Sequence, residues 1–211
     1  MISRTTPVVV VAIAVALFSC SGSQLDGLVS ELGALPATLG PQIRSDGRAI
    51  DDEVARSRLY TQLYYSGEAG VLALGRGLRH EDVQIRRNSA LALFALGFGF
   101  YPWGDIRLPK LDISPALQDL EGALVDDDAR VRASAAQAIG QIGPAAGSAV
   151  MRLIDMLDSD VEGDRNSACI ALRFIGPPAI EALPALRGAL SDPSEHVRRS
   201  AELAIAAIET G

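Results

Sequence analysis

The sequence predicts an all-α protein, a solenoid of stacked antiparallel helical hairpins, and three observations lead to this prediction. Apolar residues make up 48% of the 211 residues, which is enough to form a core. A pattern of aliphatic, small and arginine positions occurs four times after residue 67. Within each copy the aliphatic residues are spaced as on amphipathic helices. A single hairpin cannot bury its own apolar stripe, so neighbouring hairpins must stack to cover it.

Four arginines occupy one column of this repeat, and they are Arg86, Arg132, Arg165 and Arg198. Aliphatic residues precede each arginine by 15, 12 and 8 positions, which is the spacing of one stripe on a first helix. Small residues 3 and 6 positions after the arginine, and large aliphatic residues 7 and 10 positions after it, form the buried side of a second helix. The four units are expected at residues 67–97, 114–143, 144–176 and 177–211.

Three of the second helices are followed by glycine at the same column, namely Gly97, Gly143 and Gly176. We expect each glycine to end its helix with a positive φ, which costs glycine little. In the fourth unit Glu209 takes this column, and Glu202 takes a column that holds small residues in the other units. Charged residues on the outer side of a last repeat are typical of a solenoid terminus. Residues 20–66 are expected to hold a linker and a degenerate N-terminal helical cap.

The repeat signature is most complete in the second unit, in Leu120, Leu124, Val131, Arg132, Ala135, Ala136, Ala138, Ile139, Ile142, Gly143 and Pro144. It resembles the HEAT repeat family, in particular the short bacterial form described as phycobilisome lyase-like HEAT repeats. The resemblance extends over residues 67–209. It implies an armadillo-like helical solenoid that binds other proteins, but it indicates no single partner because such repeats serve many.

The arginine column has two interpretations. Its members form either an anion-binding ladder or a structural ladder in which each arginine pairs with an aspartate between the helices, and we favour the structural ladder. The candidate aspartates are Asp126, Asp128, Asp160 and Asp192. Further arginines on the second helices are candidates for a positive, partner-binding strip on the concave face, and they are Arg87, Arg173 and Arg199.

The first two units are separated by thirteen residues more than the later units, and this insertion falls within residues 98–113. It joins two hairpins, where a repeat array tolerates additions. The insertion is rich in aromatic side chains, which often anchor protein interfaces. Its candidate partner-binding residues are Phe100, Tyr101 and Trp103. The alternative is that nearby aromatic residues thicken the core beside the N-terminal cap, and these are Tyr60, Phe94 and Phe98.

Residues 1–19 are an expected signal peptide, because a positively charged start is followed by an apolar run too short to span a bilayer. The run ends in Leu17-Phe18-Ser19-Cys20, which resembles the lipobox of bacterial lipoproteins. The resemblance implies lipidation of Cys20 and attachment to a membrane of the bacterial cell envelope. The outer membrane is favoured because Ser21 follows the cysteine. The alternatives are an exported protein of another kind and a cytoplasmic protein.

Composition narrows the function classes. The 26 acidic and 19 basic residues give a net charge of −7, which disfavours nucleic-acid binding. HEAT-like di-iron enzymes use several His-Glu pairs, whereas this chain has the single pair His80-Glu81, so we expect no metal or other cofactor. Cys169 is expected to be a small buried residue. We therefore predict a non-catalytic, membrane-tethered scaffold that binds another protein or a peptide. The alternatives are a lyase-like or auxiliary enzyme subunit and a cytosolic scaffold.

Overall fold

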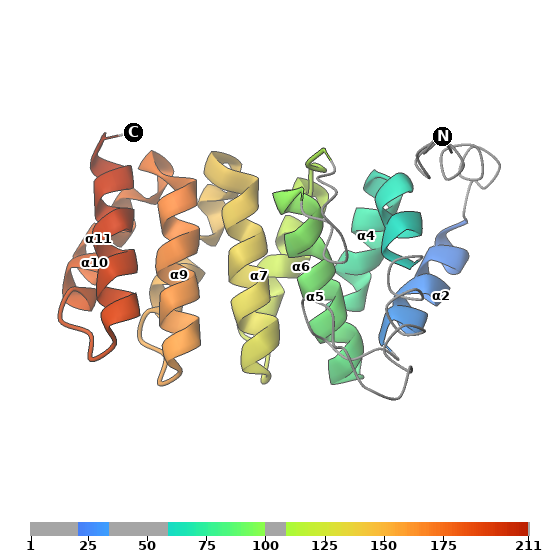
Figure 1. The fold of residues 1–211 in the computed structure, drawn as a ribbon, viewed down its shortest axis with the longest axis horizontal. Coiled ribbons are helices and arrows are strands. Elements are labelled where there is room, and N and C mark those ends of the chain that lie inside the picture. Colours follow the sequence, from blue (N-terminus) through green and yellow to red (C-terminus); the bar gives the residue numbers. More distant parts are fainter. Residues whose placement is uncertain (1–20, 34–58, 100–108, 211) are drawn as a thin grey trace, which may run out of the picture.

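The computed structural model describes residues 21–33, 59–99 and 109–210, which form helices and their connections (Figure 1). The helices are α2 (Gly22–Gly33), α4 (Glu68–Gly77), α5 (Val83–Phe98), α6 (Leu117–Ala123), α7 (Ala129–Ile142), α8 (Val150–Met156), α9 (Glu162–Ile175), α10 (Leu183–Ala189) and α11 (Glu195–Thr210). Short 3-10 helices precede α6, α8 and α10, and they are η1 (Ser114–Ala116), η2 (Gly143–Ala149) and η3 (Pro177–Ala182). Residues 59–65 are also helical. The described part of the chain is therefore all-α, as predicted.

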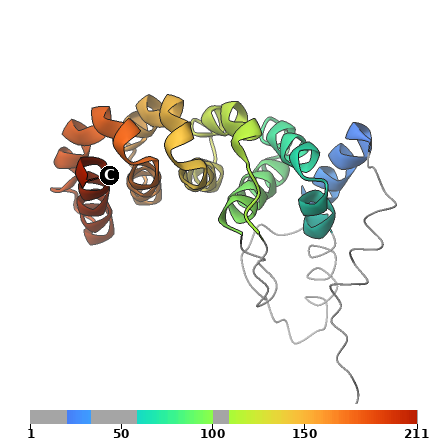
Figure 2. The same ribbon diagram turned by 90° about the horizontal axis from the view of Figure 1, so that it is seen from above.

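The helices are arranged in two layers. The second helices α5, α7, α9 and α11 lie side by side, and each packs on the next. The first helices α4, α6, α8 and α10 form the other layer, and each packs on the second helix of its own unit. From above, the layers follow an arc, and the second helices lie on its inner side (Figure 2). The predicted solenoid of stacked helical hairpins is thus confirmed.

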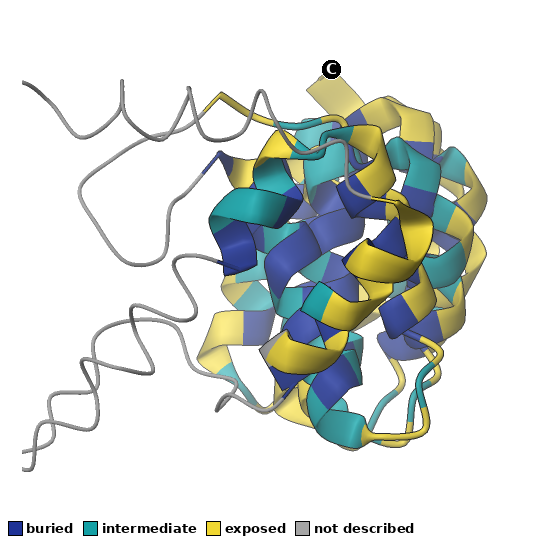
Figure 3. Ribbon diagram, turned by 90° about the vertical axis from the view of Figure 1, so that its right-hand side faces the viewer, coloured by how far each residue is buried: buried dark blue, intermediate teal, exposed yellow. Residues whose placement is uncertain are grey.

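The columns that define the repeat become the core. The leucines twelve positions before the column arginines are fully buried in all four units, and they are Leu74, Leu120, Leu153 and Leu186. Along the stack, buried positions concentrate between the two layers, while exposed positions face outward (Figure 3). Full burial of one such side chain stabilises the fold by about 1.5–3 kcal/mol. Because part of that cover comes from the next unit, the stack is held together along its whole length.

Glycine ends the second helices of the second and third units as predicted. Gly143 has φ 74° and ψ −142°, and Gly176 has φ 70° and ψ −139°. Residues other than glycine avoid this region of backbone conformation. The prediction for Gly97 is wrong, because α5 continues through Phe98 and ends at Gly99, with φ 72°. A Cβ on Gly97 would lie 2.9 Å from the Cβ of Gln141. Gly97 therefore permits close packing of α5 on the next unit.

At the N-terminal end, α2 packs on α4 and α5. Its buried face carries Leu25 and Val29. On its exposed side, Asp26 Oδ1 lies 2.7 Å from Nη2 of Arg76 in α4. The helix therefore covers the first repeat with an apolar stripe and one surface ion pair.

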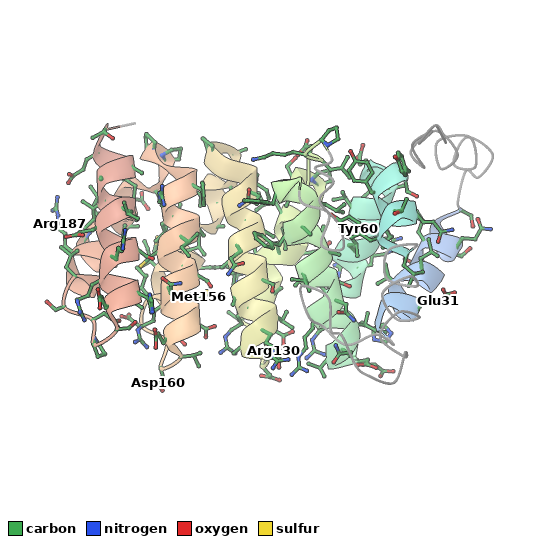
Figure 4. The ribbon with its side chains drawn as sticks, viewed as in Figure 1. Glu31, Tyr60, Arg130, Met156, Asp160 and Arg187 are labelled. Atoms are coloured by element: carbon green, nitrogen blue, oxygen red, sulfur yellow. The ribbon has the colours of Figure 1, made fainter. Side chains whose placement is uncertain are left out.

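The aromatic residues near this end divide between core and surface. Tyr60 is 2% exposed, Phe94 is half-buried and Phe98 is exposed. Only Tyr60, labelled in Figure 4, thus contributes fully to the core.

Several predicted features lie outside the described residues. These are the signal peptide at residues 1–19, Cys20, most of the linker and cap, and the aromatic residues Phe100, Tyr101 and Trp103. Within the described ranges, no helix is both long and apolar enough to cross a membrane.

The last unit is polar where the earlier units are apolar. Glu202 on α11 is exposed, whereas the residues at its column in the other units are fully buried, namely Ala90, Ala136 and Cys169. Glu209 lies within α11, and its carboxylate accepts a hydrogen bond of 3.0 Å from Arg187. The outer side of α11 therefore carries the charged residue Glu202 at a column whose residues are buried in the other three units.

Candidate partner-binding surface

The column arginines join neighbouring units through the turns between their helices. Arg86 Nε lies 2.6 Å from Oδ2 of Asp126, and Arg165 Nε lies 2.7 Å from Oδ2 of Asp192. In each pair the aspartate belongs to the next unit. The Nη1 group of each arginine also donates to a backbone carbonyl oxygen of its own turn, as Arg86 does to His80 at 3.0 Å. One guanidinium thus closes its own hairpin and binds the following one.

The third unit supplies its carboxylate from a different position. The column that holds Asp126 and Asp192 holds Ser159 in this unit. Arg132 binds instead to Asp164 in the first turn of α9, with 2.6 Å between Nη2 and Oδ2. The Ser159 hydroxyl donates to the same Oδ2 at 2.8 Å. Asp164 is fully buried at a column that holds Ile85, Val131 and Val197 in the other units.

Asp160, one of the aspartates suggested by the sequence, does not take this place. It is exposed at the end of α9 that carries the inter-helix turn, as its label in Figure 4 shows. The carboxylate of Asp164 was missed because its column is apolar in every other unit.

Arg198 occupies the same column in the fourth unit. Its Nη1 donates to the carbonyl oxygens of Asp192 and Pro193 at 2.7 and 3.0 Å. Within the described residues, its Nε and Nη2 contact no carboxylate. The charge-assisted half of the ladder is therefore present only where a following unit supplies an acid.

Electrostatics are consistent with a structural ladder. The hydrogen bond that Arg86 donates to Asp126 raises the pKa of Arg86, and the hydrogen bond from Arg165 lowers the pKa of Asp192. The arginine side chains in the three inter-unit pairs are only 15–19% exposed. Because these guanidinium groups already have carboxylate partners, they are not open positions for an external anion.

Arg87 is also bound within the protein. Its Nε donates to Asp128 Oδ1 at 2.9 Å, and its Nη2 contacts the other carboxylate oxygen. The hydrogen bond from Arg87 lowers the pKa of Asp128 to about 2. Asp128 also accepts hydrogen bonds from the backbone N–H groups of Arg130 and Val131, so it caps α7. The structure thus places Arg87 in an inter-unit bridge rather than in a free positive strip.

The other two arginines of the suggested strip are exposed but separated. Arg173 lies in the last turn of α9, with its guanidinium carbon 5.6 Å from the ring centroid of Phe174. Arg199 lies near the start of α11. Because neighbouring second helices run in the same direction, the two charges lie at opposite ends of the layer.

The base of the insertion packs against the end of α5. The backbone N–H of Leu111 donates to the carbonyl of Leu96 at 3.1 Å, and the Tyr64 hydroxyl donates to the carbonyl of Pro109 at 3.1 Å. Burial raises the pKa of Tyr64. These contacts hold the described end of the insertion at the C-terminal end of α5.

The inner face of the arc presents side chains that the ladder does not use. We define the inner face as the residues five and eight positions after the column arginines that reach solvent, namely Leu91, Phe94, Gln137, Ile170, Arg173, Leu203 and Ala206. They lie on the second helices, which line the inner side of the arc (Figure 2). The sequence predicts a contact on the concave face of the second helices, but apart from Arg173 it does not single out these residues, because their two columns mix aliphatic, aromatic, polar and charged side chains.

The side chains of Cys169 and His80 are buried or hydrogen-bonded within the protein. Cys169 is fully buried, and burial raises the pKa of its thiol to about 12. His80 Nδ1 accepts a 3.0 Å hydrogen bond from the backbone N–H of Asp82. Within the described residues, no group of three or more His, Cys, Asp or Glu side chains could hold a metal ion.

The comparisons with known proteins agree with this architecture. The HEAT repeat family matches residues 116–146, which cover most of the second unit and the start of the third. The fold is similar to that of a designed armadillo repeat protein in complex with the peptide (KR)4, at 22% identity and a TM-score of 0.59, covering 88% of this chain and 82% of that one. It is also similar to the complex of CpcE and CpcF of phycocyanin lyase from Nostoc sp. PCC7120, at 19% identity and a TM-score of 0.62, covering 87% and 99%.

A third similar structure is an engineered protein, at 20% identity and a TM-score of 0.57, covering 94% of this chain and 96% of that one. The search of curated proteins gave no match. The chain therefore has one segment that matches the HEAT repeat family, and its fold is that of armadillo and HEAT repeat solenoids.

Proposed function

We propose that this protein is a non-catalytic scaffold that holds another protein or an extended peptide against its inner face. The observation that carries the proposal is that two sets of residues on the second helices have different surroundings. Arg86, Arg132 and Arg165 are engaged between units, while the inner-face residues reach solvent on the inner side of the arc. The designed armadillo protein among the similar structures is in complex with a peptide, which supports the same use here.

The chemistry of the inner face suits an extended segment. Phe94, Ile170 and Leu203 offer separate apolar contacts on three helices. Gln137 on α7 lies between them and can both donate to and accept from a peptide backbone. Aromatic and aliphatic anchors with polar groups between them are typical of specific protein interfaces.

A photo-crosslinking amino acid at Gln137 tests the location of the partner. The matched control is Gln118, an exposed residue of the same type on α6 in the outer layer. We expect crosslinked adducts in envelope fractions from position 137 and none from position 118. Adducts from position 118 alone would assign the partner to the outer layer and contradict the proposal.

The insertion is a second candidate contact. Replacing Trp103 by Ala is expected to weaken partner capture while leaving the helical content, measured by circular dichroism, unchanged. A loss of helical signal in this variant would instead assign Trp103 to packing.

We further propose that Cys20 is lipidated and tethers the scaffold to a membrane of the bacterial cell envelope. The lipobox-like sequence supports this. Labelling with a palmitate analogue is expected in the wild type and absent in Cys20→Ala. The buried Cys169 remains in both chains and serves as an internal control for nonspecific labelling. Unlabelled wild-type protein in the cytosolic fraction would favour the cytosolic scaffold.

A second candidate function is an auxiliary subunit of a lyase-like enzyme. The similarity to the complex of CpcE and CpcF of phycocyanin lyase motivates it. In that case the partner crosslinked at position 137 would carry a covalent chromophore, and deletion of this chain would abolish its attachment. Unchanged absorbance of the partner in the deletion strain would leave the scaffold as the better explanation.

A further inference from the structure

The two edges of the solenoid differ in how many carboxylates they carry. We define the charged edge as the turns within the units, residues 79–82, 125–128, 158–161 and 191–194. We define the proline-rich edge as the connections between units, residues 109–116, 143–149 and 176–182, with the last turns of α5 and α9. The turns of the charged edge hold eight carboxylates and Arg79, and three of these carboxylates pair with Arg86, Arg87 and Arg165. The connections of the proline-rich edge hold two carboxylates, one lysine and five prolines. Carboxylates are therefore concentrated at one edge of the solenoid.

The proline-rich edge exposes apolar side chains accompanied by cations. Phe98 is 45% exposed, and Lys110 Nζ lies 6.0 Å from its ring centroid. Phe174 is 46% exposed and has Arg173 over its ring. Ile180 is 63% exposed in η3. Aromatic rings next to long cationic side chains are characteristic of the interface between lipid headgroups and acyl chains.

The chain begins its described part on the side of this edge. Gly33, at the end of α2, lies against Ile85 in the first turn of α5, which is at the charged edge. A helix of 12 residues rises about 18 Å, so the start of α2 points away from the charged edge. Figure 1 shows α2 descending in this sense at the N-terminal end of the stack. Ser21 therefore leads upstream toward Cys20 from the half of the molecule that carries the proline-rich edge.

We propose that the proline-rich edge rests on the membrane surface, with Phe98 and Phe174 in the headgroup region. This inference rests on the proposed tether at Cys20 and adds an orientation to it. The carboxylates of the charged edge are then held away from anionic lipid, which would repel them. The last unit contributes least to the membrane contact, because the surface near the end of α11 carries the ion pair of Arg187 and Glu209. The inner face stands upright on the membrane, so a partner approaches alongside the bilayer.

Site-specific fluorescence measures this orientation. The chain from Ser21 to Gly211 is attached through an N-terminal hexahistidine tag to vesicles of phosphatidylcholine, phosphatidylglycerol and a nickel-chelating lipid. An environment-sensitive thiol probe is placed at Ile180→Cys or, as the matched control, at Val125→Cys, which is 69% exposed at the charged edge. Cys169 stays unlabelled because its thiol is buried. Brominated lipid is expected to quench the probe at position 180 and to leave the probe at position 125 bright.

The aromatic contacts are tested in the same system. Without the tag, the double variant Phe98→Ala and Phe174→Ala should bind these vesicles about tenfold more weakly than the parent chain, as expected for two partly buried rings. Leu203→Ala, a truncation of similar exposure on the inner face, should bind like the parent. In the tagged chain, quenching at position 180 should fall in the double variant. Circular dichroism verifies that each variant is folded.

The possible failures are distinguishable. Equal quenching at positions 125 and 180, or stronger quenching at 125, overturns the orientation whether or not Cys20 is lipidated. Absence of palmitate labelling overturns the natural tether, while edge-specific quenching on the surrogate tether would still show that this edge binds lipid. An unchanged vesicle affinity in the double aromatic variant overturns the assignment of Phe98 and Phe174.

Discussion

The charged edge and the proline-rich edge join neighbouring units in different ways. At the charged edge, side chains reach across, as Arg86 does to Asp126 and Arg132 does to Asp164. Toward the proline-rich edge, the backbones approach, and a Cβ on Gly140 would lie 3.2 Å from the Cα of Ala171. An ion pair can be rebuilt from another position, as the third unit demonstrates. A backbone approach this close requires glycine at its own position, so the packing of α7 on α9 depends on Gly140 more strictly than the ion pairs depend on the position of their carboxylate.

The largest expected effect comes from the relocated carboxylate. Asp164→Val removes the buried partner of Arg132 and should destabilise the protein by about 3 kcal/mol in urea unfolding. The double variant Ser159→Asp and Asp164→Val recreates the pattern of the second unit, in which Asp126 and Val131 occupy these columns. It should recover most of the loss. A double variant as unstable as the single one would show that the charged edge cannot be rebuilt in this way.

Glycine at the proline-rich edge should come next in magnitude. Gly176→Ala forces a side chain into a backbone region with φ 70°, which should cost about 2 kcal/mol. Gly163→Ala is the matched control, because it lies in α9 with nothing within 4 Å of the added carbon. It should stabilise the protein by about 0.5–1 kcal/mol through helix propensity. Thermal unfolding of both variants measures the difference, and equal shifts would refute a special role for this conformation.

The two halves of the arginine ladder can be separated by comparing Arg165→Ala with Arg198→Ala. Both variants lose hydrogen bonds to turn carbonyls, but only the first leaves a mostly buried carboxylate, Asp192, without its arginine. We expect Arg165→Ala to be the less stable by about 1–2 kcal/mol in urea unfolding. Equal losses would mean that the bonds to the carbonyls carry the stabilisation at the charged edge.

The smallest effect is a pH dependence at the charged edge. The pKa of Asp128 is lowered to about 2 by its bond to Arg87, against an ordinary value of about 3.9. The pair therefore stabilises the fold above about pH 4 and loses this contribution as the pH falls toward 2. With allowance for solvent screening, Asp128→Asn should remove about 1 kcal/mol of the acid-dependent change. Asp127→Asn, at an exposed neighbour, should leave that change as in the wild type.

The sequence predicts the repeating part of this structure well because it depends on local periodicity. The buried leucines and the ends at Gly143 and Gly176 follow from spacing along one helix pair. Some features that depend on contacts between units do not follow. The end of α5 at Gly99 was missed because Gly97 matched the glycine column although it packs on the next unit.

The candidate site was less predictable than the fold. Arg87 looked free, since its partner Asp128 lies 41 residues away in the sequence. Asp164 was missed because a carboxylate that moves from a turn to a helix leaves its alignment column while staying near the same guanidinium group. The columns of the inner face mix residue types, so the full set of inner-face residues is recognised only when the second helices are placed side by side.

The ladder also has a direction, because Arg86, Arg132 and Arg165 each reach toward the unit that follows in the chain. If one hairpin were deleted from the middle of the chain, the column arginine of the preceding unit would lie next to the aspartate of the following unit. If residues 144–176 were removed, Arg132 would meet Asp192, as Arg165 does now. Gene duplication or deletion in multiples of one unit can therefore lengthen or shorten the arc while the arginine–aspartate pairs between units are kept.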